Sequence, residues 1–572
     1  MQRLGKYIKP YGLYITFTML IKLGATGVEL LIPFFMEMIL DDVVPAGNKK
    51  GIFIFGGLML FCSLTCLALN IIANRMSAVS SGKITRKLRY DLFAKLEGLS
   101  AKQLDGLTVS SAESRLTSDT YNVNQMLARV QRLGVRAPIL LVGGIAMMLG
   151  MDAVLALILV AMLPLIALIV YIVTKKSIPL YKYEQSVLDR MVRVLSENIT
   201  GIRVIKALSR SEHEKTRFED VNSELTSVDR KAGMLTAVTN PATSLVLNIG
   251  LTAVVLLGAF RVNGGFGKSG VIIAFLQYFV MILNAMLGIT RIFVMWSKGQ
   301  ASALRIADVL QMGSDLDTLP ASSAGSDAAI EFRNVSFSHN GVGKDLDSIS
   351  FKLMPGETLG ILGPTGSGKS TLLSLLMRTY DADEGTVFVG GKDVREWDRA
   401  ELLSKFGAAF QNDFVMEGTI GENIGFFRDI PEDELRRASR DAQADEFIAL
   451  KENGFDSYVA VRGNNLSGGQ KQRLLIARAL ASDPDILVLD DASSALDYRT
   501  DADLRRAIAS RGKKRTVVTV AQRVSSVRGC DRILVLSDGK TVGFGTHDEL
   551  MENCPEYRFV AESQMGSGKE AV

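Results

Sequence analysis

The stretch Gly363-Pro-Thr-Gly-Ser-Gly-Lys-Ser-Thr371 decides the fold predicted for the second half of this chain. It follows the apolar run Thr358–Leu362 and precedes the helix-like pattern Leu372–Met377, so a strand, a glycine-rich loop and a helix are predicted in that order. Glycines let the backbone of such a loop curl until its N–H groups point at phosphate oxygens, and the helix N-terminus adds partial positive charge. We therefore predict a phosphate-binding loop formed by Gly363, Pro364, Thr365, Gly366, Ser367, Gly368, Lys369, Ser370 and Thr371.

Length and composition limit what the rest of the chain can be. At 572 residues the chain predicts several domains, and its hydrophobic content of 48% is concentrated before residue 300. The net charge of +4 gives no basis for a nucleic-acid partner. The four cysteines have no spacing typical of a metal site or a disulfide framework, so we interpret them as reduced thiols: Cys62, Cys66, Cys530 and Cys554.

Six apolar stretches each reach the roughly 20 residues that a membrane-spanning helix requires. The third and fourth are separated only by Met151 and Asp152, which predicts a tight helical hairpin. The N-terminus shows no small-residue cleavage site, so we interpret the first stretch as a retained span. The predicted spans are residues 13–36, 52–74, 133–151, 153–174, 242–262 and 271–296.

Two long charged segments, 75–132 and 175–241, separate these spans and predict helical hairpins outside the membrane. Because both are rich in Lys and Arg, the positive-inside rule places them and both chain termini in the cytoplasm. A stretch rich in Ser, Asp, Gly and Ala follows the last span and predicts a flexible linker. The expected domains are a membrane domain at 1–310, a linker at 311–329 and an α/β nucleotide-binding domain at 330–572.

Two further motifs accompany the phosphate-binding loop. Ile486–Asp490 is an apolar strand that ends in a carboxylate, a pattern suited to holding Mg²⁺ through water. In Leu466-Ser-Gly-Gly-Gln470, the spacing of Ser467 and Gln470 is that of a capping box, which opens a helix whose free N–H groups can bind phosphate.

Leu466–Gln470, followed by a helix that begins Lys-Gln-Arg, resembles the signature motif of the ABC transporter ATPases, and the six preceding spans resemble the exporters of that family. The resemblance covers essentially the whole chain. It implies a six-helix type I exporter domain followed by an α/β P-loop ATPase domain, with ATP and Mg²⁺ as cofactors. It also implies that two such chains pair head to tail, so that the signature of one faces the γ-phosphate held by the other. The matching positions are Gln411 in the Q-loop and Ser494–Asp497 in the D-loop, with nucleotide contacts from Ser467, Gly468, Gly469, Gln470 and Asp497 and Mg²⁺ held by Ser370, Gln411 and Asp490.

The chain departs from the family pattern at three positions. The catalytic glutamate is replaced by Asp491, and a carboxylate misplaced by one methylene can cost on the order of 10²-fold in rate. The switch histidine is replaced by Gln522, which can hydrogen-bond phosphate but cannot carry the imidazole's proton. The adenine-stacking aromatic aligns with His339, which stacks with less area.

These departures predict a site that binds ATP and turns it over poorly. The pattern resembles the degenerate half of bacterial heterodimeric multidrug-type exporters, so the expected partner is a non-identical chain with an intact Glu and His. The expected function is ATP-driven export of amphipathic or hydrophobic small molecules, of the drug or lipid type, across the plasma membrane. Two alternatives stay open: a homodimeric exporter in which Asp491 is a slow base, and an ATP-gated or regulatory membrane protein.

Polar residues inside the spans are candidates for the transport path. Gln277, Asn284 and Arg291 recur every seven residues on the sixth span, which predicts a cavity-lining stripe or, alternatively, polar contacts between helices. Lys22 and Glu29 share that spacing on the first span and could pair with each other or face the cavity. By resemblance, the tips of the charged hairpins are expected near 118–124 and 207–214, docking close to the Q-loop.

Overall fold

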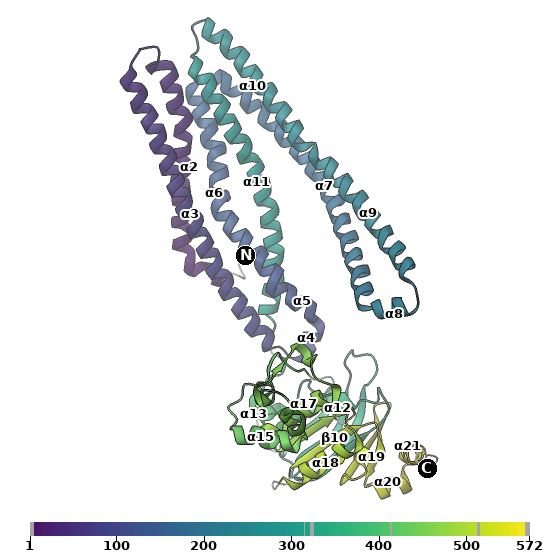
Figure 1. The fold of residues 1–572 in the computed structure, drawn as a ribbon. Coiled ribbons are helices and arrows are strands. Elements are labelled where there is room, and N and C mark those ends of the chain that lie inside the picture. The colour runs from purple at the N-terminus through teal and green to yellow at the C-terminus, as the bar shows by residue number, and fades with distance from the viewer. Residues whose placement is uncertain are drawn as a thin grey trace. The chain divides into compact units, whose positions relative to one another are not determined.

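The computed structural model describes residues 5–313, 315–320, 325–411, 414–492, 494–511 and 515–566. The chain divides into two compact units, which Figure 1 draws as long helices and as a mixed α/β fold. The first unit is Met1–Glu97 with Ser110–Met312, and the second is Gly98–Val109 with Gly313–Val572.

The first unit is helical and contains six helical stretches long and apolar enough to cross a membrane, which confirms the six predicted spans. Two groups of helices are visible in Figure 1: α2, α3, α6 and α11 pack together, while α7, α9 and α10 run side by side away from them. The helices are α1 (Gly5–Ile8), α2 (Gly12–Met38), α3 (Lys49–Glu97), α5 (Val109–Ser114), α6 (Thr120–Met151), α7 (Ala153–Thr200), α8 (Ile202–Ala207), α9 (Ser211–Ala237), α10 (Thr239–Asn263) and α11 (Ser269–Leu310).

The predicted tight hairpin lies between α6 and α7. The Asp152 carboxylate accepts hydrogen bonds from the backbone N–H groups of Val154 and Leu155, so it caps the first turn of α7. Arg261 of α10 pairs with the same carboxylate at 3.2 Å and ties α10 to this end of α7. Apolar side chains of α2, α6, α7, α10 and α11 form the core of the unit.

The first charged hairpin turns earlier than predicted. Its bend contains α4 (Ala101–Leu107), where Ser100 and Gln103 form a reciprocal capping box and Thr108 ends the helix with φ +61°. The predicted tip at 118–124 is wrong, because those residues continue from a π-helical turn into α6. The second hairpin turns through α8 and residues 208–210, so the predicted tip at 207–214 overlaps the turn only in its first half, since α9 already begins at Ser211.

The second unit contains a six-stranded sheet in the order β12-β11-β3-β10-β9-β6, parallel except for the edge strand β12, and a four-stranded antiparallel sheet in the order β2-β1-β4-β5. The strands are β1 (Ile330–Phe337), β2 (Leu346–Leu353), β3 (Thr358–Leu362), β4 (Glu384–Val389), β5 (Lys392–Asp393), β6 (Phe406–Ala409), β7 (Gly418–Thr419), β8 (Tyr458–Val459), β9 (Ile486–Asp490), β10 (Thr516–Ala521), β11 (Arg532–Ser537) and β12 (Lys540–Gly545). The helices are α12 (Lys369–Leu376), α13 (Arg399–Ser404), α14 (Ile420–Gly425), α15 (Glu432–Asp441), α16 (Asp445–Ala449), α17 (Gly468–Ala481), α18 (Tyr498–Ser510), α19 (Val524–Val527), α20 (His547–Asn553) and α21 (Pro555–Gly566).

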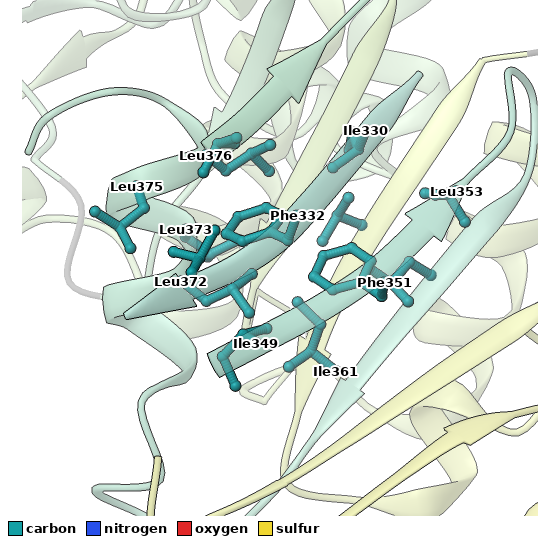
Figure 2. Close-up of a cluster of buried hydrophobic side chains, with 14 of the residues drawn as sticks. Ile330, Phe332, Ile349, Phe351, Leu353, Ile361, Leu372, Leu373, Leu375 and Leu376 are labelled. Atoms are coloured by element: carbon teal, nitrogen blue, oxygen red, sulfur yellow. The ribbon is translucent and has the colours of Figure 1, made fainter. Parts of the chain in front are cut away.

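The helix that follows the phosphate-binding loop is anchored by the core. Figure 2 shows four leucines of α12 beside the aromatic and aliphatic side chains of β1, β2 and β3. Phe332 and Phe351 stack with ring centroids 4.8 Å apart, and Leu372 is fully buried. Because the first turn of α12 carries Lys369 and Ser370, this packing holds their backbone in place.

Candidate functional site

The phosphate-binding loop has the conformation that its glycines permit. Gly366 and Gly368 have φ values of +85° and +97°, and a Cβ at Gly368 would lie 2.5 Å from a Leu346 side-chain carbon. Lys369 Nζ donates hydrogen bonds to the carbonyl oxygens of Gly363 at 2.8 Å and Pro364 at 2.7 Å. The loop therefore wraps around the ammonium group and holds it above the first turn of α12.

A cavity of about 310 Å³ opens beside this loop. It brings together residues that the sequence analysis took from five separate motifs. Of the remaining loop residues, Gly363 and Pro364 contribute the carbonyls that hold Lys369, and the Ser367 hydroxyl is buried with no hydrogen-bond partner among the described residues. The cavity is lined by His339, Asp345, Thr365, Gly366, Gly368, Lys369, Ser370, Thr371, Gln411, Asp490, Asp491, Val520, Ala521 and Gln522.

Two adjacent carboxylates face this cavity from the end of β9. Burial raises the pKa of Asp490, and the neighbouring Asp491 charge raises it further, against the opposite effects of Lys369 and a hydrogen bond with Ser370. Burial also raises the pKa of Asp491, against the charges of Lys369 and Arg523. The negative charge of ionised Asp490 and Asp491 is therefore only partly compensated by the neighbouring cations.

These residues fit Mg²⁺. Ser370, Gln411 and Asp490 offer a hydroxyl, an amide and a carboxylate oxygen in one cavity, which are the hard oxygen donors that Mg²⁺ prefers. When bound, the ion would neutralise charge on phosphate oxygens. Gln411 Nε2 also donates to Asp491 Oδ2 at 3.2 Å, so the Q-loop holds the carboxylate that follows the strand.

The segment Gln522–Val524, which we call the switch segment, is held in place by hydrogen bonds from the C-terminal helix α21. Gln564 of α21 donates its amide to the Gln522 carbonyl oxygen at 3.0 Å and accepts the Val524 N–H at 2.7 Å. Sequence reasoning missed this residue, and no local signal could have found it, because 42 residues separate it from Gln522.

His339 lines the cavity, but its ring is held by neighbours. Its backbone N–H donates to Asp345 Oδ2 at 2.7 Å, and its Nδ1 lies 3.1 Å from the same oxygen. The backbone hydrogen bond is the main reason why the pKa of Asp345 lies below its usual value. The ring packs edge-on against Phe337 and Tyr380, with centroids 4.8 and 5.1 Å away. Asp345 and Tyr380 were not identified from the sequence.

The signature segment does not line this cavity. Ser467 caps α17 in a capping box with Gln470, as predicted from their spacing. Gln472, one turn further on, accepts the Ala495 N–H at 2.9 Å and so ties α17 to the D-loop. Asp497 caps α18 by accepting the Thr500 N–H at 2.9 Å. Within one chain, the residues Ser467, Gly468, Gly469, Gln470 and Asp497 therefore lie outside the lining of the P-loop cavity.

The two charged residues of the first span each have a partner on another helix. Lys22 is 4% exposed and donates to the side-chain oxygen of Asn70 on α3. Glu29 accepts two hydrogen bonds from Arg136 on α6, at 2.7 and 3.3 Å. Among the described residues, Lys22 and Glu29 therefore bind partners on other helices and not each other, so the expected pairing of the two is wrong.

The predicted stripe on α11 is only partly described. Gln277 and Asn284 are exposed, whereas the residue that follows each of them, Tyr278 and Ala285, is buried. The side chain of Arg291 lies outside the described residues.

Two family models match the chain in the order of its two units. The model described as "ABC transporter transmembrane region" matches residues 15–286, and the one described as "ABC transporter" matches residues 346–494. The uncharacterized ABC transporter ATP-binding protein YfiB of Bacillus subtilis (strain 168) is 32% identical over 568 residues, which cover 99% of both chains. This chain belongs to the ABC transporter family. Like other half-transporters of the family, it fuses one six-helix membrane domain to one ABC ATPase domain, an arrangement that implies a second ABC half for ATP-driven transport.

Other ABC transporters resemble it over much of its length. An uncharacterized ABC transporter ATP-binding protein of Mycobacterium tuberculosis, Rv1273c, is 34% identical over 572 residues, covering 98% of this chain and 97% of its own. The fatty acid ABC transporter ATP-binding/permease protein of Mycobacterium bovis is 32% identical over 481 residues, covering 83% of this chain and 76% of its own. The solved structure of a bacterial Atm1-family ABC exporter with ATP bound has the same fold, with a TM-score of 0.81, 22% identity, and coverage of 98% of this chain and 99% of that one.

Proposed function

We propose that this ABC half-transporter is the degenerate-site half of a heterodimeric exporter for amphipathic or hydrophobic small molecules. The observation that carries the proposal is that Asp491 and Gln522, which replace the family's glutamate and histidine, line one cavity together with the P-loop lysine. Two replacements at the same site act on the same reaction.

Three features of Asp491 make it a poor general base. Its side chain is one methylene shorter than glutamate, and its backbone has a positive φ of +50°, a conformation costly for most side chains and more tolerable for aspartate. Its carboxylate accepts a hydrogen bond from Gln411, which occupies an oxygen that would otherwise be free to take a proton from the attacking water. These features favour slow hydrolysis at this chain's own site.

Gln522 can contribute only hydrogen bonds to the same cavity. An amide cannot gain or lose a proton near neutral pH, so the charge that an imidazole could place beside phosphate is not available. His339, constrained by Asp345, offers the adenine a smaller stacking surface than tyrosine would. We infer that ATP binds here with Mg²⁺ held by Ser370, Gln411 and Asp490, and that it remains bound for longer than one transport cycle at the partner's site.

The proposed partner is a non-identical ABC half-transporter that keeps both the glutamate and the histidine. Support comes from the signature segment, which has the family sequence and lies outside the lining of its own chain's cavity. A second support is α8 with its following loop, where Ile202, Val204 and Leu208 are exposed in the single chain and offer apolar contact to another chain.

The proposed setting is a bacterial plasma membrane with both termini in the cytoplasm, in line with the bacterial relatives and the positive charge of the two hairpins. We propose domain limits of 1–310, 311–329 and 330–572; α11 ends at Leu310 and β1 begins at Ile330. The relative named for fatty acid transport supports an amphipathic substrate class. Gln277, Asn284 and Arg291 are proposed to line the transport path.

The test is ATP hydrolysis by the purified full-length chain in lipid nanodiscs, before and after the double substitution Asp491→Glu with Gln522→His. We expect a slow unmodified chain and an increase on the order of 10²-fold in the restored variant. Asp433→Glu, an equal extension of an exposed carboxylate on α15, is the matched control and should change nothing. Brisk hydrolysis by the unmodified chain, with no gain on restoration, would overturn the proposal in favour of a homodimer with Asp491 as base.

A further inference from the structure

A group of four charged side chains and one neutral amide inside the membrane unit carries a net positive charge. We name it the Lys22 cluster: Lys22 and Glu29 on α2, Asn70 on α3, and Arg132 and Arg136 on α6. Lys22 is 4% exposed although it lies ten residues beyond the start of α2. A buried ammonium group needs a compensating anion or a strong polar environment.

The direct partner of Lys22 is neutral. Its ammonium donates to the amide oxygen of Asn70, whose own amide donates to the Cys66 carbonyl oxygen at 2.8 Å and contacts Cys66 Sγ at 3.2 Å. Thr26, the neighbour one turn along α2, donates its hydroxyl to the Lys22 carbonyl oxygen at 2.8 Å and brings no charge. These contacts orient the lysine without neutralising it.

The one carboxylate of the cluster is already engaged. Glu29 receives both hydrogen bonds of the Arg136 guanidinium, a bidentate pair in which the two side chains are 21% and 38% exposed. Arg132 lies one helical turn before Arg136 on α6, and its Nε donates a hydrogen bond to the Ala128 carbonyl oxygen of its own helix. Three cations therefore share one anion.

The sequence extends the positive charge along α6. Arg129, Arg132 and Arg136 are three and four residues apart, which places all three on one face of this helix. Glu29 contacts the last of them, so this face meets α2 at the cluster. Lys22 and Glu29 are seven positions apart on α2, a rise of about 10 Å, so the cluster extends over two helical turns.

We propose that the Lys22 cluster binds the anionic headgroup of a transported amphiphile, a carboxylate or a phosphate, whose negative charge neutralises Lys22 and Arg132. The inference rests on the proposed export of amphipathic compounds and narrows the substrate class to acidic ones. Arginine and lysine are suited to this task because guanidinium groups bind carboxylate and phosphate in a bidentate manner and an ammonium acts as a compact charge. Glu29 limits the affinity, because it keeps Arg136 occupied and repels a second anion.

The test is binding of a fluorescent single-chain fatty acid to the full-length chain in nanodiscs of phosphatidylcholine, a zwitterionic lipid with no net charge. The competitors are an unlabelled carboxylate, an alkyl phosphate and an alkyl alcohol, all of equal chain length. We expect the two anions to compete at least about tenfold better than the alcohol, and their ratio identifies which headgroup the cluster prefers. Equal competition by the alcohol would overturn the proposal.

Substitutions of opposite sign separate an electrostatic site from a structural one. Lys22→Gln and Arg132→Gln should each weaken anion binding about tenfold, whereas Glu29→Gln should tighten it by a similar factor because Arg136 is released. Lys268→Gln removes an equal charge from an exposed ion pair with Asp42 and should have no effect. If Glu29→Gln weakens binding as much as Lys22→Gln does, the cluster serves only to hold the helices together.

The measurement requires neither hydrolysis nor a partner chain. Failure of the degenerate-site proposal would therefore leave its outcome unchanged, and failure here would leave ATP turnover by the restored variant unchanged. Thermal unfolding of each variant shows whether a lost signal reflects lost folding. If a variant does not fold, the anion-to-alcohol competition ratio of the unmodified chain tests the proposal by itself.

Discussion

The P-loop cavity and the signature segment belong to the same ATPase domain, yet they differ in how closely they follow the family pattern. The cavity carries all three departures that we identified, at His339, Asp491 and Gln522. The signature segment, Leu466–Gln470, carries none and keeps its capping box. In the proposed heterodimer, the cavity holds this chain's own nucleotide and the signature completes the site on the second chain, so the difference favours loss of turnover at one of two sites over general decay of the domain.

The largest effect is expected from a substitution in the signature segment, which keeps the family sequence. In the chain restored with Asp491→Glu and Gln522→His, Gly469→Asp should lower ATP hydrolysis by about 10²- to 10³-fold. This is the magnitude expected when a group that stabilises charge in the transition state is lost. An aspartate there brings negative charge towards phosphate, and its Cβ would meet the Ala495 carbonyl oxygen at 3.2 Å. The matched substitution Gly529→Asp, at a position with open space around it, should leave hydrolysis unchanged. Equal hydrolysis in both would mean that the signature does not complete another chain's site.

Nucleotide binding by the P-loop cavity is expected to depend on its lysine, Lys369. Lys369→Met should weaken ATP binding to the unmodified chain by about 10²-fold, because the loop wraps around this ammonium group and no other cation replaces it there in the described lining of the cavity. Titration with a fluorescent ATP analogue measures the effect, and Lys352→Met, which removes an exposed ammonium paired with Asp327, serves as control. An unchanged affinity in Lys369→Met would show that Lys369 does not contribute to nucleotide binding in this cavity.

The adenine contact offers a smaller effect. His339→Tyr should tighten ATP binding by about 3- to 10-fold, because the larger ring provides more stacking area. The gain is limited by loss of the contact with Asp345. His213→Tyr, at an exposed position of α9, should not change the affinity. A weaker affinity in the His339 variant would mean that the imidazole is the better partner for the bound base.

The smallest effect is expected at Gln564, whose hydrogen bonds hold the switch segment in place. In the restored chain, Gln564→Ala should lower kcat about threefold with KM for ATP unchanged, because its two hydrogen bonds position residue 522 without touching nucleotide. Gln564→Glu keeps the acceptor for Val524 and should recover part of the loss. Glu562→Ala, on an exposed position of the same helix, is the control. A change in KM alone would contradict a positioning role.

The sequence predicts the candidate site well where the signal is local. The P-loop glycines, the capping box of Ser467 and the buried strand before Asp490 are all visible within a few residues, and each lies in the structure in the predicted element. The bend of the first charged hairpin was predicted too late, although Gly98 and the Ser100–Gln103 capping box mark it. The predicted position followed the family pattern instead of this weak local signal.

By itself, the sequence determined the six membrane spans, the ATPase fold and the chemistry of the P-loop, because hydrophobic periodicity and glycine-dependent turns act over short stretches of chain. Only the tertiary structure decided that Lys22 meets Asn70 and that Glu29 meets Arg136, across 48 and 107 residues. The same holds for Gln564 and the switch segment. Such pairs depend on how helices pack against one another, and packing places distant residues together without leaving a pattern in the local sequence.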